Sequence, residues 1–390
     1  MSLDEVADSP ILRLIDRIFE MRREGAEILS LHIGEPDFET PLGIREAAFR
    51  AMNSGRTHYV AAQGSPGLRA AIADRLRTRH GIPARAETVV VVPAKFALYA
   101  SLLATVGPGD EVLLPDPTYL LVQPAQLVGA RPVFFPLRED FSFDLDAMAR
   151  AITPRTRAVV LVSPSNPTGR LLTEEDIRGI LGLARRHGLV VISDETYESL
   201  VYEGVHVAPA AVAGADTTVI TIGSFSKIYS MTGWRIGYAI APAAIVARLV
   251  KIVEHTLTCV PPFIQDAAEW ALANASEDEA RFRATFRERR DHLVERLSKI
   301  RGVAFVRPQG AFYVFPKYDL PLSSVEFCEA LLQEERVAVV PGIAFGPHGE
   351  RHFRISYSNR PEVLDEAMAR LERFVERHRA PGIGGPPPFL

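Results

Sequence analysis

A lysine at position 227 has neighbours that would let its amine do covalent chemistry. It ends the run Gly223-Ser224-Phe225-Ser226-Lys227, which follows the apolar stretch Val219–Ile222, and Arg235 comes eight residues later. A lysine amine can form a Schiff base with an aldehyde cofactor, while hydroxyls and a guanidinium hold a phosphate beside it. Among the five lysines of the chain, only Lys227 has these neighbours. The run indicates a pyridoxal 5′-phosphate (PLP) site, although a lone lysine would be read as a surface loop residue.

Apolar runs in the middle of the chain predict the scaffold that positions this lysine. They are rich in β-branched residues and lie at Thr88–Val92, Glu111–Leu114, Ala158–Val162, Leu189–Ser193 and Val219–Ile222. The runs are apolar throughout rather than alternating, as in a parallel sheet that helices cover on both faces. Between two of them lies a helical pattern, which begins at a Thr173 N-cap and ends at His187-Gly188. We therefore expect an α/β domain built from βαβ units.

Polar residues follow three of these runs at similar intervals. Asn166, Asp194 and Ser224 are separated by 28 and 30 residues, about one βαβ unit each. Because the carboxyl ends of parallel strands meet at one edge of a sheet, the three side chains should converge where open α/β sheets bind ligands. A carboxylate at Asp194 would keep a pyridine nitrogen protonated, and Asn166 and Tyr197 could hydrogen-bond the phenolic oxygen of the ring.

Each of these residues also has an ordinary structural interpretation. Asn166 precedes Pro167 and could simply form a turn. Asp194 could be a helix N-cap, and Tyr197 could be a packing residue. Their convergence on one sheet edge favours the functional interpretation.

Donors for a phosphate and contacts for the ring are predicted at two further strand ends. The run Pro93–Ala97 follows a strand and opens an apolar helix, so the backbone N–H groups of Ala94 and Lys95 could bind an anion. Tyr119, which follows the strand at Glu111–Leu114, could lay its ring against the cofactor, with core packing as an equal alternative.

Arg354 lies between apolar neighbours in Phe353-Arg354-Ile355-Ser356. A charge in such a place is rare unless it is paired. A bidentate clamp on the α-carboxylate of a substrate suits it well. An internal salt bridge is the second interpretation.

Composition limits the classes of protein to which the chain can belong. The chain has 390 residues, 47% of them hydrophobic and 24% charged, and a net charge of −4. This balance argues against disorder, nucleic-acid binding and attachment to an anionic membrane. Two cysteines suit a reducing compartment, and no apolar run reaches the roughly 18 residues of a membrane span. The acidic N-terminus lacks a signal-peptide core. We expect a cytoplasmic protein without a membrane anchor or a metal site.

The chain is long enough for two domains. We expect an N-terminal arm and helix at 1–44, a large α/β domain at 45–280 and a small α+β domain at 281–390, which ends in a flexible tail at 380–390 rich in proline and glycine. The N-terminal helix, about Pro10–Gly25, should pack with the small domain. The elements expected there are a charged helix from Glu277 to about Arg301, a strand pair near Gly302–Pro316, a helix at Ser323–Glu335, strands at Val337–Val340 and His352–Ser356, and a helix at Pro361–Arg379.

Taken together, these motifs resemble those of the class I/II aminotransferases of the aspartate-aminotransferase superfamily, PLP fold type I. The resemblance covers nearly the whole chain, and its landmarks occur in the order of the family. They are Gly34-Glu35-Pro36-Asp37-Phe38, Tyr59, Pro117-Thr118-Tyr119, Asn166-Pro167-Thr168-Gly169, Asp194-Glu195-Thr196-Tyr197, Ser224-Phe225-Ser226-Lys227, Gly233-Trp234-Arg235 and Phe353-Arg354-Ile355-Ser356.

The resemblance implies a role for each residue of the site. Lys227 is implied to form the internal aldimine and then to shuttle the substrate proton. The phosphate is implied to bind Ser224, Arg235, Ala94 and Lys95, with Ser226 beside the cofactor and Tyr119 stacked on its ring. Gly34, Asn166 and Arg354 are implied to bind the α-carboxylate. Tyr59 is implied to reach the phosphate of a neighbouring subunit, which makes the enzyme a homodimer with shared active sites.

The sequence departs from its relatives at two places. Pro93 stands where relatives often have glycine or serine, and it has no N–H to donate to a phosphate. The segment Glu254–Pro262 resembles a loop that reads the substrate side chain across the dimer, but it contains no arginine. Lys95, in contrast, matches a lysine that aspartate-type relatives use for an acidic side chain; a role in screening the phosphate is equally compatible.

These expectations lead to a PLP-dependent transferase of amino-acid metabolism. We expect ping-pong transfer of an amino group from an amino acid to a 2-oxo acid, with aspartate-type substrates. The alternative is another PLP reaction on the same fold, such as a β-eliminating C–S lyase or a biosynthetic oxidase or cyclase, because the cofactor stabilises the same carbanion in all of them. A PLP-sensing regulator would need a DNA-binding module, for which the chain has no spare hundred residues.

Overall fold

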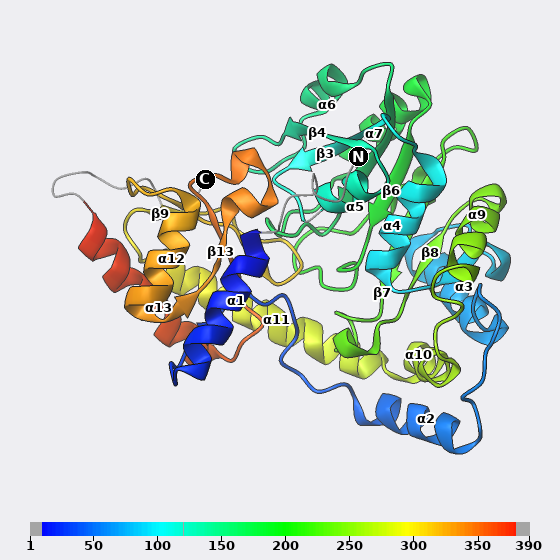
Figure 1. Ribbon diagram of the computed structural model, residues 1–390, viewed down its shortest axis with the longest axis horizontal. Coiled ribbons are helices and arrows are strands. Elements are labelled where there is room, and N and C mark those ends of the chain that lie inside the picture. Colours follow the sequence, from blue (N-terminus) through cyan, green and yellow to red (C-terminus); the bar gives the residue numbers. More distant parts are fainter. Residues whose placement is uncertain (1–9, 120, 380–390) are drawn as a thin grey trace.

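The computed structural model describes residues 10–119 and 121–379, and within them a seven-stranded sheet forms the largest element (Figure 1). The strand order is β2-β8-β7-β6-β5-β3-β4. Neighbours from β7 to β4 pair in parallel, whereas β8 is antiparallel to both β2 and β7. The strands are β2 (Val89–Val91), β3 (Glu111–Asp116), β4 (Arg131–Pro136), β5 (Thr156–Val162), β6 (Val190–Asp194), β7 (Val219–Ser224) and β8 (Gly237–Ile240).

All five predicted apolar runs form strands of this sheet and run in the same direction. The register pairs Val162 with Asp194, and Asp194 with Ile222, so that β5, β6 and β7 end side by side. Two strands, β4 and β8, were not predicted. β4 contains two prolines, which disfavour a strand, and β8 is only four residues long.

Helices cover both faces of the sheet, as the unbroken apolar runs predict. On one face, α4 (Ala94–Thr105), α5 (Val122–Leu127) and α9 (Ala243–Glu254) pack on Val112, Val160 and Ile222. On the other face, α6 (Leu145–Ala151), α7 (Glu174–His187) and α8 (Pro209–Val212) pack on Leu113, Val159 and Val191. A third layer of α2 (Leu42–Asn53), α3 (Pro66–His80) and α10 (Pro262–Asn274) covers the β2 end.

The ends of α7 follow the predicted signals. The Thr173 side chain accepts a hydrogen bond from the Asp176 N–H, and the Asp176 carboxylate accepts one from the Thr173 N–H at 2.9 Å. Gly188 ends the helix in the left-handed region, with φ of 64°, which favours glycine. This capping box fixes the chain between β5 and β6.

A second core lies in the C-terminal part of the chain (Figure 1). Its helices are α11 (Ser276–Leu297), α12 (Ser324–Glu335) and α13 (Pro361–His378). Its strands form the sheet β10 (Tyr313–Val314), β14 (Phe353–Ser356) and β13 (Val340–Pro341), and the pairs β9 (Val303–Ala304) with β11 (Lys317–Tyr318), and β1 (Leu29–Ser30) with β12 (Val337–Ala338). Short 3₁₀ turns occur at Ala86–Thr88, Thr232–Trp234, Gly342–Phe345 and Pro347–Gly349.

The strand pair predicted near Gly302–Pro316 is formed by β9 and β11, whereas β10, which lies between them in the sequence, pairs with β14. The residues between β9 and β10 do not form a tight turn. Instead, the N–H groups of Gln309 and Gly310 donate to the Gly169 carbonyl of the large sheet region. The backbone there is satisfied by a distant segment, which local sequence does not reveal.

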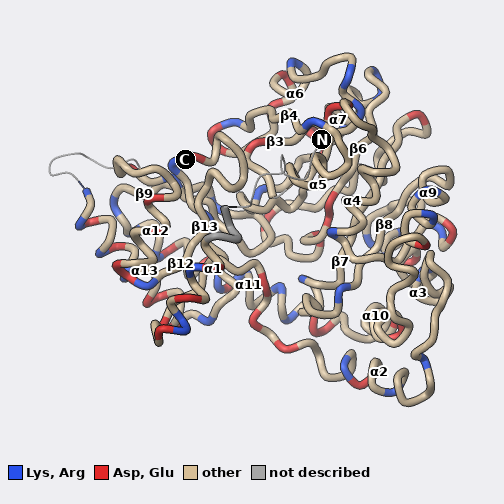
Figure 2. Tube along the Cα trace, viewed as in Figure 1, with Lys and Arg blue, Asp and Glu red and all other residues tan. Residues whose placement is uncertain are grey.

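The N-terminal helix α1 (Pro10–Arg23) packs on the C-terminal part, as predicted: Leu14, Ile18 and Met21 contact Leu332 and Ala338. The predicted tail at 380–390 lies outside the described residues. Basic and acidic positions are interspersed along the trace rather than separated by sign (Figure 2). Among the described helices, none has the length and apolar character needed to cross a bilayer. The same residues contain no group of His, Cys, Asp and Glu able to hold a metal ion.

Candidate active site

A cavity of about 320 Å³ opens at the carboxyl edge of the parallel strands and collects nearly every predicted site residue. Its lining includes Gly34, Ala94, Lys95, Tyr119, Asn166, Asp194, Tyr197, Ser224, Ser226, Lys227, Arg235 and Arg354. The polar residues that follow β5, β6 and β7 therefore converge as the strand spacing predicts.

Lys227 lies just beyond β7, and its ammonium donates a hydrogen bond to the Gly34 carbonyl. Burial lowers the pKa of its amine from 10.5 to about 8, while the Glu35 carboxylate opposes that shift. A desolvated amine with a pKa near 8 is a far better nucleophile and base at neutral pH than an exposed lysine. The surface-loop interpretation is therefore wrong for this lysine.

Asp194 ends β6, and its carboxylate oxygen Oδ1 accepts from the Thr196 N–H at 3.0 Å and the Thr196 hydroxyl at 2.6 Å. No helix begins there, since a turn follows, so Asp194 is not a helix N-cap. Burial raises the pKa of its carboxyl, and it forms no ion pair with another described residue. A cation that bound beside Asp194 would restore the charged form.

Arg354 on β14 is 3% exposed and forms no ion pair with any acid in the described part of the chain. Its Nη1 donates to the Asn166 side-chain oxygen at 3.1 Å, and its Nη2 donates to the His32 carbonyl at 2.6 Å. Its Nε has no hydrogen-bond partner among the described residues. The interpretation as an internal salt bridge is therefore wrong, and the charge remains available for an anion.

The opposite end of the cavity presents groups that can donate hydrogen bonds to a phosphate. Helix α4 begins at Ala94 with no side-chain cap, so its first N–H groups are free to bind an anion. Ser224 and Ser226 lie beside it, and the Ser226 N–H donates to the Ser224 hydroxyl at 3.1 Å. Arg235 is exposed, has a left-handed backbone with φ of 55°, and donates to the Thr232 carbonyl at 2.8 Å.

Aromatic side chains form the walls between these two ends. The Tyr197 and Tyr313 hydroxyls are 2.8 Å apart, and burial raises the pKa of both phenols. Tyr119 lies at the cavity edge, with the Lys95 ammonium 6.0 Å from its ring centroid. Lys95 is exposed and forms no ion pair with another described residue.

Tyr59 is the predicted site residue that the structure does not bring to the cavity of its own chain. It lies in the segment between α2 and α3 and is 86% exposed.

Several residues of the cavity were not predicted as site residues: Ile15, His32, Ile33, Thr196, Thr232 and Tyr313. His32 is the most unusual of them, because it is 5% exposed and its Nδ1 has no partner among the described residues. Burial lowers the pKa of its imidazole to about 4, with Arg354 and Arg22 acting in the same direction. Its place two residues before Gly34 was the only available signal.

The residues that line the cavity fit PLP. The uncapped end of α4, the two serine hydroxyls and the guanidinium of Arg235 suit a phosphate. The amine of Lys227 suits an aldehyde, and the buried carboxylate of Asp194 lacks a cation that a pyridinium nitrogen would supply. None of the charged groups of this set forms an ion pair with a residue in the described part of the chain.

Comparison with known proteins identifies the family to which the chain belongs. The family model for aminotransferase class I and II matches residues 26–371. An aspartate aminotransferase from Pyrococcus abyssi is 40% identical over 386 residues, 97% of this chain and 98% of its own. Aromatic-amino-acid aminotransferase 2 from Thermococcus litoralis is 38% identical over 94% of this chain and 96% of its own.

A solved structure extends the likeness to the fold. The aspartate aminotransferase from Thermus thermophilus with maleate superposes with a TM-score of 0.90 and 35% identity, over 96% of this chain and 99% of that one. Both the sequence and the whole architecture are thus shared with enzymes that transfer amino groups. The chain belongs to the class I and II aminotransferases.

Proposed function

We propose that the cavity binds PLP and that the chain uses it to transfer an amino group between an amino acid and a 2-oxo acid in a ping-pong cycle. One observation supports this best: the cavity holds an amine, a carboxylate and a guanidinium, at Lys227, Asp194 and Arg354, and none of them is in an ion pair with a described residue. Unpaired charges in such a place are costly unless a ligand completes them.

When bound, PLP supplies an aldehyde and a ring that accepts the electron pair of the breaking Cα–H bond. The protein supplies the rest. Lys227 holds the cofactor through its Nζ and, once released, takes the proton from the substrate Cα. Asp194 keeps a proton on the pyridine nitrogen, and Asn166 and Tyr197 bind the phenolic oxygen. The backbone N–H groups of Ala94 and Lys95 hold the phosphate together with Ser224, Ser226 and Arg235, and Tyr119 stacks on the ring.

The substrate lies at the other end of the cavity. Arg354 and Asn166 bind its α-carboxylate with the backbone of Gly34, which orients the Cα–H bond toward Lys227. We infer aspartate-type specificity from Lys95, which lines the cavity with an ammonium that has no described ion-pair partner. The names of the relatives include both aspartate and aromatic-amino-acid aminotransferases. We propose that Lys95 is the residue that selects an acidic over an aromatic substrate.

We also propose the assembly and the compartment. The enzyme acts as a homodimer in which Tyr59 completes the phosphate site of the neighbouring subunit, which accounts for a tyrosine that is 86% exposed. Each chain divides into the arm at 1–44, the large domain at 45–280 and the small domain at 281–390. Both cysteines, Cys259 and Cys328, are free thiols, which suits the reducing cytoplasm.

The amine gives a direct test. Protein incubated with PLP and then reduced with borohydride should carry a stable phosphopyridoxyl group on the peptide that contains Lys227, as located by mass spectrometry. Lys227→Ala should lack this group and lose turnover of amino acid with 2-oxo acid. Labelling of another lysine, or full activity of Lys227→Ala, would overturn the assignment.

A further inference from the structure

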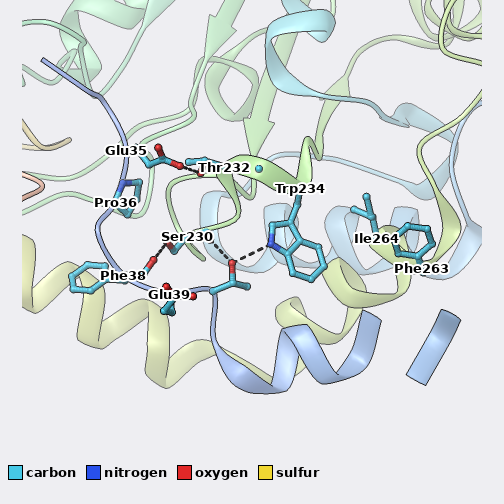
Figure 3. A pocket seen from close by; sticks show the side chains of 11 residues that line it. Glu35, Pro36, Phe38, Glu39, Ser230, Thr232, Trp234, Phe263 and Ile264 are labelled. Carbon is cyan, nitrogen blue, oxygen red and sulfur yellow. Dashed lines mark hydrogen bonds between the residues drawn. The ribbon is translucent and has the colours of Figure 1, made fainter. Parts of the chain in front are cut away.

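The segment of residues 34–40, here called the strap, lines one side of a second, open pocket next to the active site (Figure 3). It joins β1 and the following residues to helix α2. Side-chain hydrogen bonds fasten it to the loop that precedes Arg235. They join Thr40 and Phe38 to Ser230, Glu35 to Thr232, and Thr40 to the Trp234 indole. One side of the strap is thereby fixed to the large sheet region.

The other side of the strap is fixed to helix α11 by a single ion pair. Arg289 donates to both carboxylate oxygens of Asp37, at 2.6 and 3.0 Å, and also to the Ser358 carbonyl at 2.8 Å. The Arg289 side chain is 8% exposed and that of Asp37 is 27% exposed. The rings of Phe38 and Phe282 stack at 4.3 Å, and the guanidinium of Arg289 lies over Phe38. The pair is bidentate and shielded, unlike an ordinary surface salt bridge.

The strap thus connects the two groups on which the reaction depends. Its first residue, Gly34, accepts the hydrogen bond from the Lys227 ammonium. Arg289, which binds Asp37 of the strap, also donates to the Ser358 carbonyl. Ser358 comes two residues after the end of β14, the strand that carries Arg354. Only glycine fits at position 34, because a Cβ there would collide with the Tyr313 hydroxyl. The strap therefore lies tightly between the amine and the substrate-binding side of the cavity.

We propose that Asp37 and Arg289 are positioning residues of the reaction: their ion pair holds the strap against Lys227 and keeps water from its amine. The proposal rests on the function given above for Lys227. Neither residue lines the active-site cavity, so both act through the strap rather than by touching a substrate.

The direction of the effect follows from the surroundings of the amine. Burial is the largest cause of the lowered pKa of Lys227. Release of the strap would admit water and move that pKa from about 8 back toward 10.5. Loss of the Gly34 carbonyl as an acceptor for the ammonium would act in the opposite direction. The charged groups that face the amine are Glu35 on the strap, Arg354 on β14, Arg235, and Asp194 on β6. Only Glu35 would move with the strap, and the loss of its carboxylate would oppose the rise, but burial remains the largest cause.

The test measures the amine itself in the full-length protein freed of cofactor. Trace labelling with acetic anhydride across a pH series, followed by mass spectrometry of the Lys227 peptide, should give half-maximal reactivity near pH 8 in the wild type. In Asp37→Asn/Arg289→Gln, the midpoint should rise by about one pH unit, so that labelling at pH 8 becomes about fivefold slower. The double variant leaves no unpaired charge in the shielded site.

Two matched variants show whether the effect belongs to the strap. Asp365→Asn breaks ion pairs of 3.0 and 3.1 Å with His292 and Arg296, on the same helix α11, and should leave the Lys227 profile unchanged. Arg289→Lys keeps the charge without the planar fork and should shift the midpoint by an intermediate amount. A folded double variant with the wild-type profile, or an equal shift in Asp365→Asn, would overturn the proposal. Because trace labelling requires neither PLP nor turnover, its result is independent of the borohydride test of the proposed function.

Discussion

At the scale of single residues, Arg354 has surroundings that most directly specify a ligand. A guanidinium that is 3% exposed has lost most of its hydration, and its two hydrogen-bond acceptors are neutral oxygens of Asn166 and His32. A buried charge of this kind is destabilising unless an anion completes it. A carboxylate would do so, because two parallel N–H···O bonds match the guanidinium plane.

Arg354→Gln should therefore weaken the binding of amino and oxo acids far more than it changes the fold. Loss of one partner of a buried, hydrogen-bonded charge pair costs about 3 kcal/mol, which corresponds to a roughly hundredfold rise in KM. Steady-state kinetics with both substrates would measure it. Arg351→Gln, which alters an arginine bonded to the Leu320 carbonyl, is the control. Unchanged KM in Arg354→Gln would move the carboxylate site elsewhere.

Lys95 determines whether the enzyme prefers acidic side chains. Removal of an exposed partner of an ion pair costs about 1 kcal/mol, so Lys95→Met should lower kcat/KM for aspartate about fivefold. The value for phenylalanine should stay constant or rise. A parallel fall for both amino acids, together with weaker binding of PLP, would show that Lys95 screens the phosphate instead.

The sequence predicted which residues form the site better than it predicted which distant residues of the chain contact them. Asn166, Asp194 and Ser224 could be placed together because strand spacing and parallel pairing fix their positions. His32 could not, since its carbonyl binds Arg354, which is 322 residues away in the chain. The pairing of Asp37 with Arg289, 252 residues apart, is equally invisible to local pattern.

At the scale of elements, the site depends on how closely β7, β8 and the start of α4 approach one another. Gly237 opens β8, the strand that was missed because it is short and runs against the others. A Cβ on Gly237 would lie 2.6 Å from the Gly223 carbonyl oxygen and 3.0 Å from the Ala94 nitrogen. The absence of a side chain at this position lets the helix N-terminus sit at the sheet edge.

Gly237→Ala should therefore displace the end of α4 from the phosphate site. Overpacking of this kind costs about 1–3 kcal/mol, and we expect PLP affinity to fall about tenfold, as measured by equilibrium titration of the cofactor-free protein. Gly182→Ala, in α7, meets no atom closer than 3.6 Å and should leave the affinity unchanged. Wild-type affinity in Gly237→Ala would show that α4 does not hold the phosphate.

At the scale of the whole molecule, the face formed by α2 exposes several large apolar side chains to solvent. Leu42 and Phe49 on α2 are each 61% exposed, and Met52 is 40% exposed. Together with Trp234 and Phe263 they border an open pocket. Helix α2 itself lies at the edge of the molecule (Figure 1). Contiguous apolar surface of this kind is typical of a protein interface. In the proposed homodimer, this face and Tyr59, which follows α2 in the chain, belong to the interface between the two copies.

Shared active sites predict complementation between two inactive variants. Lys227→Ala lacks the amine but keeps Tyr59, whereas Tyr59→Ala lacks the tyrosine but keeps the amine. Random exchange of subunits gives mixed dimers in which one site of two has both residues, so about a quarter of all sites become complete. Turnover should reappear after the two variants are unfolded and refolded together, but not when they are refolded separately. Phe49→Asp, added to both variants, should abolish complementation. Val205→Asp, added in the same way, is the control: it alters a side chain that is 76% exposed and distant from α2 in the sequence, and it should leave dimerisation normal. If the co-refolded mixture stays as inactive as its parts, each subunit must build its site from its own residues, and Tyr59 has no role across the interface.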